Sequence, residues 1–148
     1  MTLAGSSYVL LEFSPSVELS TIHRAISDAF IEGLTPIIAH FERYKCLIDK
    51  IARCEEVVNM GALLQTNASS VICSKGGMVG SREKKIIKKL MKKQLISFVA
   101  SDAHEDECRT PRLKECYQYV SKKFGKDYAQ KIFYDNQEKL IYDEQITN

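Results

Sequence analysis

The sequence has no apolar run long enough to cross a membrane and no secretory signal. A membrane-spanning helix needs about 18 or more consecutive apolar residues, and no stretch of the 148 residues approaches that length. The N-terminus lacks a charged region followed by a long apolar core, which a signal peptide requires. The cytoplasm is therefore the expected location, and no membrane insertion is expected.

Cysteine is present, but its spacing excludes several kinds of site. The five cysteines are odd in number, and no two form a C-x-x-C pair, which argues against a disulfide framework and a thiolate zinc site. None has an arginine six residues downstream, the position from which a thiol-based phosphatase would grip its phosphocysteine. Covalent catalysis by cysteine is therefore disfavoured, and reduced thiols are expected.

The chain also lacks a strong excess of charge of either sign. Its 21 basic and 19 acidic residues give a net charge of +2 and a pI near 8.2, too mild to indicate a nucleic-acid partner for the whole domain. With 45% hydrophobic residues, a chain of this length can bury one ordinary core. Residues 1–148 are therefore expected to form a single domain.

Short apolar runs alternate with amphipathic stretches along the chain. Strands are predicted at 8–13, 37–39, 62–67 and 96–100, and helices at 19–31, up to Met60, at 82–94, at 111–124 and at 127–133. This alternation predicts βαβ units and a mainly parallel sheet, in an α/β fold. The continuous apolar strands agree, because parallel sheets bury both faces.

Polar residues lie where these predicted strands end. Asp102 and His104 follow the last strand, and alternate residues of an extended segment point the same way, so both side chains project together. His40 and Glu12 end two other strands. Catalytic residues of parallel α/β folds gather at the carboxyl ends of strands. We therefore predict a metal site at this edge, with Glu12 and His40 on neighbouring strands.

Arg43 follows His40 by three residues, and a guanidinium beside a metal site suits an anion such as phosphate. Simpler interpretations stay open for each residue. Asp102 and His104 could form a strand-end hydrogen bond or a helix N-cap, His40 could be a core histidine, and Glu12 could pair with a buried arginine. Arg43 and Arg109 could form ordinary salt bridges.

A lysine stripe marks the helix predicted at 82–94. Its members are Lys84, Lys85, Lys88, Lys89, Lys92 and Lys93, and apolar residues fill the opposite face. This pattern is typical of the solvated outer face of a barrel helix. The rival interpretation is a basic surface for nucleic acid or an acidic partner, although no aromatic platform accompanies it.

Four segments together carry a family resemblance. They are Leu10–Phe13, Gly33–Tyr44, Gln65–Ser70 and Ala100–His104, the last followed by Arg109 and Pro111. In order and spacing they resemble the bacterial protein-tyrosine phosphatases of the polymerase-and-histidinol-phosphatase (PHP) superfamily. The resemblance spans nearly the whole chain.

The resemblance implies a distorted (β/α)7 barrel with three divalent metals, usually manganese, although iron or zinc would also suit these ligands. It implies hydrolysis of phosphotyrosine by a metal-bound hydroxide. The implied metal ligands are Glu12, His40, Asp102 and His104, and the implied phosphate-binding residues are Arg43 and Arg109. The implied substrate is the tyrosine-rich tail of a kinase that controls capsule or exopolysaccharide export.

The chain departs from the family pattern at its start. The family's H-x-H motif and bridging glutamate lie upstream of the strand that carries Glu12, and here that strand follows Met1 closely. We therefore expect a C-terminal portion, with about four parallel strand–helix units of a partial barrel. Smaller departures are Phe41, where proline is usual, and Gln137, where the family has proline after asparagine.

A partial barrel should leave apolar surface exposed around Tyr8, Val9 and Leu11. It should then self-associate or bind a missing N-terminal segment in trans, and it could be inactive alone. Two alternatives to a phosphatase remain. One is a non-catalytic remnant or binding module of the same fold, and the other is a basic interaction domain whose histidines are incidental.

Overall fold

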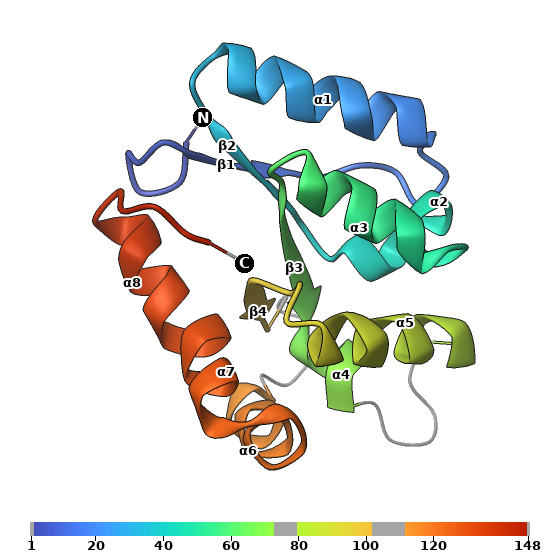
Figure 1. Ribbon diagram of the computed structural model, residues 1–148, viewed down its shortest axis with the longest axis vertical. Coiled ribbons are helices and arrows are strands. Elements are labelled where there is room, and N and C mark those ends of the chain that lie inside the picture. The colour runs from blue at the N-terminus through green and yellow to red at the C-terminus, as the bar shows by residue number, and fades with distance from the viewer. Residues whose placement is uncertain (1, 73–79, 102–111, 148) are drawn as a thin grey trace.

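A four-stranded parallel sheet lies at the centre of the protein. The computed structural model describes residues 2–72, 80–101 and 112–147. Its strands are β1 (Tyr8–Leu11), β2 (Thr35–Ile38), β3 (Leu63–Asn67) and β4 (Phe98–Ala100), which neighbour one another in sequence order (Figure 1). All three pairings are parallel. The α/β fold with a parallel sheet is therefore confirmed, whereas closure into a barrel stays a prediction.

Helices follow each strand. They are α1 (Leu19–Ile31), α2 (Lys45–Ile48), α3 (Ile51–Asn59), α4 (Ala68–Ile72), α5 (Ser81–Lys92), α6 (Leu113–Phe124), α7 (Lys126–Gln130) and α8 (Asn136–Ile141), with a 3₁₀ turn η1 (Phe41–Arg43) and a π-helical turn η2 (Lys131–Asp135). The helix predicted at 19–31 is confirmed. α4 was not predicted, because its five residues are too few to show a helical period.

The prediction that the last helix ends near residue 133 is wrong. The π-helical turn η2 carries α7 into α8, so helical structure continues to Ile141. Asn136 causes part of the difference, since this polar residue interrupts the apolar pattern and yet is buried. Its Nδ2 donates to the carbonyl of Ser97, at 2.8 Å, just before β4. A buried hydrogen bond therefore attaches the C-terminal helices to the sheet.

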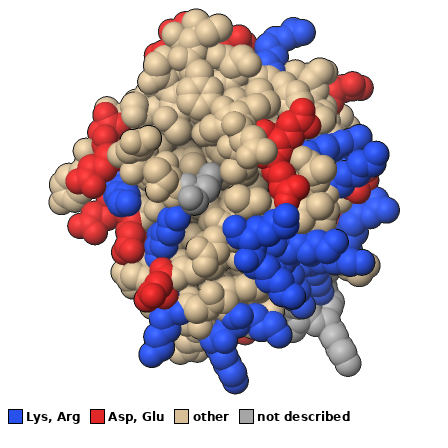
Figure 2. All heavy atoms as spheres, viewed as in Figure 1, with Lys and Arg blue, Asp and Glu red and all other residues tan. Residues whose placement is uncertain are grey.

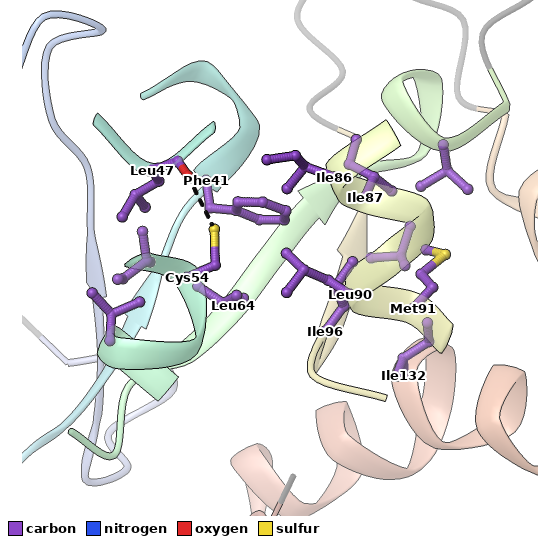
Figure 3. Close-up of a cluster of buried hydrophobic side chains, with 14 of the residues drawn as sticks. Phe41, Leu47, Cys54, Leu64, Ile86, Ile87, Leu90, Met91, Ile96 and Ile132 are labelled. Atoms are coloured by element: carbon purple, nitrogen blue, oxygen red, sulfur yellow. Dashed lines mark hydrogen bonds between the residues drawn. The ribbon is translucent and has the colours of Figure 1, made fainter. Parts of the chain in front are cut away.

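Neighbouring strand residues face opposite sides of the sheet, as the pleat requires. Ile38 and Leu64 join the larger core with buried residues of α1, α3 and α5, while Ile37 and Leu63 join a smaller one on the other face. Figure 3 shows residues of α3, β3 and α5 meeting around the fully buried Phe41. Helices α1, α3 and α5 therefore cover one face of the sheet, and Leu140 of α8 packs against the other.

The described cysteines are free, as the spacing predicted. Cys54 is buried in the core, where its Sγ donates to the carbonyl of Leu47 at 3.4 Å (Figure 3). Burial raises the pKa of both Cys54 and Cys116 to about 12, so these thiols stay protonated and unreactive at neutral pH. Cys73 and Cys108 lie outside the described residues.

The smaller core is closed by the C-terminal tail. Tyr8 donates its hydroxyl proton to the carbonyl of Glu144 (2.7 Å) and accepts the N–H of Ile146 (3.0 Å). The Ser7 backbone N–H and hydroxyl both donate to Asp143, at 2.6 and 2.7 Å. Ile146 is buried against Tyr8 in the same cluster. The segment after α8 thus returns to the start of β1.

The prediction of an exposed Tyr8 is therefore wrong. Tyr8 is only 3% exposed, because the tail covers it, and Val9 and Leu11 are half-buried. Leu10 is 44% exposed instead. The exposed apolar residue of β1 is thus Leu10, inside the predicted stretch, and not Tyr8.

Replacing Tyr8 by phenylalanine should lower the free energy of unfolding by about 1–2 kcal/mol, because the Glu144 carbonyl and the Ile146 N–H both lose their partner. Urea unfolding followed by circular dichroism measures this. Tyr142→Phe is the matched control, since Tyr142 is 69% exposed. Equal midpoints for the two variants would show that the tail does not stabilise the sheet.

No helix in the described part of the chain is long and apolar enough to cross a membrane.

Candidate functional site

Glu12 and His40 meet at the carboxyl edge of the sheet. β1 and β2 are parallel and pair Leu11 with Ile38, so the residues that follow each strand emerge at the same edge. His40 Nε2 lies 2.9 Å from Glu12 Oε1. The imidazole is 8% exposed and the carboxylate 65% exposed. The structure therefore brings together the two side chains that were predicted to lie on neighbouring strands.

The backbone at His40 adopts an unusual conformation. Its φ of 32° lies in the left-handed region, which costs a non-glycine residue free energy. A 2.6 Å hydrogen bond from the His40 N–H to Gln65 Oε1 of β3 holds it there. The next side chain, Phe41, is fully buried in the core. The turn is thus fixed by polar contact on one side and apolar packing on the other.

Tyr44 contacts the His40 ring on its Nδ1 side. Its hydroxyl oxygen lies 3.4 Å from His40 Nδ1 and accepts the Phe13 N–H at 3.1 Å. The Phe13 and Tyr44 rings pack edge to face, with centroids 5.6 Å apart. Burial raises the pKa of Tyr44 to about 12, so its hydroxyl stays neutral. Tyr44 therefore sets which nitrogen of His40 faces inward, leaving Nε2 toward Glu12.

Glu42 is a buried carboxyl next to this turn. It is 4% exposed, and its Oε1 accepts the Asn67 N–H at 3.0 Å where β3 ends. Burial raises the pKa of Glu42 above its usual range, although the bond from Asn67 opposes that shift. The Ser70 and Thr66 side chains also oppose the rise in pKa. This carboxyl therefore joins the turn to β3.

The sequence predicted neither Glu42 nor Gln65 as part of the site. Gln65 also donates from Nε2 to Asn67 Oδ1, at 3.1 Å, so one amide connects β3 to the His40 turn. The sequence did contain a signal, because three of the five residues of β3 are polar. All five are buried in the structure, as expected for a parallel strand. Buried polar side chains need hydrogen-bond partners; Gln65 Oε1 accepts a hydrogen bond from the His40 N–H, and Asn67 Oδ1 accepts one from the Gln65 amide.

The remaining predicted residues divide into two groups. Arg43 is half-buried in η1, three residues after His40. Asp102, His104 and Arg109 lie outside the described residues. β4 ends at Ala100, on the same edge as the other strands, because it pairs in parallel with β3. The chain therefore enters the segment that carries Asp102 from this edge.

The donor types at this edge fit a divalent metal ion. A carboxylate oxygen and an imidazole nitrogen are both ligands for manganese, iron or zinc. Glu12 and His40 already lie within hydrogen-bond distance. Within residues 2–72, 80–101 and 112–147, no group of three potential ligands gathers. The described residues thus supply two donors, and a complete site needs more.

A family model described as capsular polysaccharide synthesis, CpsB/CapC, matches residues 1–142 of this chain. The tyrosine-protein phosphatase CpsB of Streptococcus pneumoniae is 36% identical over 148 residues, which cover 98% of this chain and 60% of that protein. CpsB of Streptococcus agalactiae serotype V is 34% identical over 95% of the chain and 58% of the relative. The chain thus spans less than two thirds of the length of these relatives.

A solved structure is also similar. It comes from the crystal structures of YwqE from Bacillus subtilis and CpsB from Streptococcus pneumoniae, which are described as unique metal-dependent tyrosine phosphatases. The TM-score is 0.85 with 27% sequence identity, over 99% of this chain and 57% of the solved chain. The four-stranded sheet and its helices therefore occur together in an experimentally determined fold.

Proposed function

Because this chain belongs to the CpsB/CapC family of capsular polysaccharide synthesis, we propose that it serves metal-dependent hydrolysis of phosphotyrosine in proteins. The observation that carries the proposal is the 2.9 Å approach of His40 Nε2 to Glu12 Oε1 at the carboxyl edge of the sheet. Such an edge is where α/β enzymes place their catalytic groups. The matching relatives are named tyrosine-protein phosphatases.

We assign the metal ligands to Glu12 and His40 and, in the segment after β4, to Asp102 and His104. Manganese is the proposed metal, with iron or zinc as alternatives for the same donors. A bound divalent metal supplies Lewis-acid stabilisation of phosphoryl oxygens and lowers the pKa of water. Arg43 and Arg109 are the proposed phosphate-binding residues, since a guanidinium can hold two phosphate oxygens at once.

Other residues of this chain orient the ligands. A histidine that ligates through Nε2 must carry its proton on Nδ1, and the Tyr44 hydroxyl oxygen, 3.4 Å from Nδ1, is placed to accept it. Gln65 holds the His40 backbone, and Phe13 holds Tyr44. These contacts fix the imidazole before substrate binds, which reduces the free-energy cost of assembling the site.

The rest of the proposed site would come from outside these 148 residues. We propose a distorted barrel of about seven strand–helix units in the active protein, of which this chain supplies about four. The proposed substrate is a phosphorylated tyrosine-rich tail of a kinase that controls capsule or exopolysaccharide synthesis, and the proposed location is the cytoplasm. The length of the relatives, of which the chain covers 58 to 60%, supports this division.

The purified chain should bind manganese no tighter than about 10 µM by calorimetry, because its ligand set is incomplete. Its hydrolysis of a phosphotyrosine peptide should be slow. Adding the part of pneumococcal CpsB that this chain does not cover, about two fifths of that protein, should raise the rate at least about 100-fold. The mixture of the two is called the complemented enzyme below.

Two outcomes would change this conclusion. A complex that forms and binds manganese but does not turn over would favour the alternative, a non-catalytic binding module of the same fold. If the chain alone matched intact CpsB in rate, and lost that rate on His104→Ala, the additional strands would be dispensable.

The isolated chain should also self-associate. β1 pairs only with β2 among the described residues. The Tyr8 backbone on its other edge bonds to Ser6 and Leu3, and Leu10, further along the strand, is 44% exposed. Light scattering after size exclusion should show oligomers that dissociate in the complemented enzyme. A monodisperse monomer that remains folded on heating would show that these residues are self-sufficient.

A further inference from the structure

Basic charge is concentrated on α5. Six of its twelve residues are lysine or arginine and one is acidic, whereas the whole chain is nearly balanced, with 21 basic and 19 acidic residues. The apolar residues Ile86, Ile87, Leu90 and Met91 are all buried against the core. The helix therefore turns one face inward and presents an almost purely basic face to solvent.

Four lysines of this face have no acidic partner within residues 2–72, 80–101 and 112–147. Lys85, Lys88, Lys89 and Lys92 are exposed, and their spacing places them in one stripe along the helix. No described acidic residue forms an ion pair with any of them. We call these four the basic α5 surface. Figure 2 shows a continuous block of Lys and Arg side chains on one side of the molecule.

Acidic residues do reach the two ends of the helix. Arg82 pairs with Asp49 at 2.9 Å, and Lys93 pairs with Glu55 at 2.6 Å. These contacts satisfy the flanking cations, whereas no described carboxylate pairs with the four central lysines. Like charges in neighbouring turns of a helix repel one another. An anionic partner would relieve that repulsion.

We propose that the basic α5 surface is a secondary docking site for an acidic segment of the protein substrate. This inference rests on the proposed function, because it takes the partner to be the phosphotyrosine protein. α5 connects β3 to β4, which are parallel, so it runs back from the carboxyl edge where Glu12 and His40 lie. An extended segment along α5 therefore leads toward that edge.

The chemistry of the surface favours a peptide over two other polyanions. None of the twelve residues of α5 is aromatic, so the surface has no platform on which unpaired bases could stack. Its apolar residues are buried, so none is available to insert into a lipid interface. Lysine ammonium groups on flexible stems suit carboxylates or phosphates on a flexible chain.

Fluorescence anisotropy with short labelled peptides tests the proposal without catalysis. The probes are a glutamate-rich peptide without phosphate, its glutamine counterpart, and both peptides with one phosphotyrosine. At low salt the glutamate peptide should bind about tenfold more tightly than the glutamine one, and 0.5 M salt should remove the difference. The variant K85E/K88E/K89E/K92E should lose this preference.

The matched control is K114E/K122E/K123E/K126E, which reverses four exposed lysines on α6 and α7. It should keep the preference for glutamate. Equal losses in the two variants, or tighter binding of anionic vesicles or single-stranded DNA than of the peptide through the same lysines, would overturn the proposal. A preference for phosphotyrosine that survives while the glutamate preference is absent would refute docking and leave the proposed function standing. A glutamate preference without a phosphotyrosine preference would support docking and count against the proposed function.

Discussion

Replacing His40 by alanine should lower the activity of the complemented enzyme at least about 100-fold and weaken its affinity for manganese by a similar factor. The reason is that His40 supplies the one buried imidazole of the described edge, 2.9 Å from Glu12. Initial rates with a phosphotyrosine peptide, and calorimetric titration with manganese, measure the two effects. Circular dichroism should show an unchanged fold.

Two further variants sharpen this result. Tyr44→Phe should cost about tenfold in manganese affinity, because Nδ1 loses the oxygen that would accept its proton. His23→Ala should have no effect on either quantity, since His23 lies on α1, where its contact is with Glu56 at 3.7 Å. Full activity in His40→Ala, or an equal loss in His23→Ala, would contradict the assigned metal site.

Replacing Glu42 by alanine should lower the free energy of unfolding by about 2–4 kcal/mol. The change removes a buried side chain and leaves the Asn67 N–H without its acceptor. Glu42→Gln is the matched control, because its amide oxygen can still accept that N–H; it should cost less than about 1 kcal/mol. Urea unfolding measures both variants, and equal effects would mean that the hydrogen bond to Asn67 is unimportant.

The same carboxyl should make stability depend on pH. Burial raises the pKa of Glu42 in the folded state above its unfolded value. Its contribution is therefore fully present below the unfolded pKa and is lost as the pH rises through the folded pKa. Unfolding measured across this range should show the wild type losing stability relative to Glu42→Gln. Parallel curves for the two proteins would show that Glu42 does not titrate on folding.

The strands and the meeting of Glu12 with His40 could be predicted because both follow from local rules. Apolar runs mark buried parallel strands, and residues that end neighbouring parallel strands share an edge. The orientation of His40 could not be predicted in this way. It depends on Gln65, 25 residues away, and on Tyr44, whose hydroxyl also binds the Phe13 backbone. Such contacts arise only after the sheet has formed.

The contact between the C-terminal tail and β1 could not be predicted either, for a different reason. Residues after α8 have no strong apolar period, and their contact with β1 spans 138 positions in the case of Ile146 and Tyr8. One apolar side chain and a few hydrogen bonds hold them. Long-range contacts made by single residues leave no periodic signal in a sequence.

The left-handed backbone at His40 limits how this site could be transplanted into another scaffold. A designer who copied residues 40–44 alone would transfer a left-handed conformation at His40 that non-glycine residues disfavour. The copy would lack the Gln65 side chain, whose Oε1 accepts the His40 N–H at 2.6 Å. The copied loop would relax, and the imidazole would turn away from its carboxylate. The smallest portable unit therefore includes β3 and Phe13, although neither β3 nor Phe13 is a proposed metal ligand.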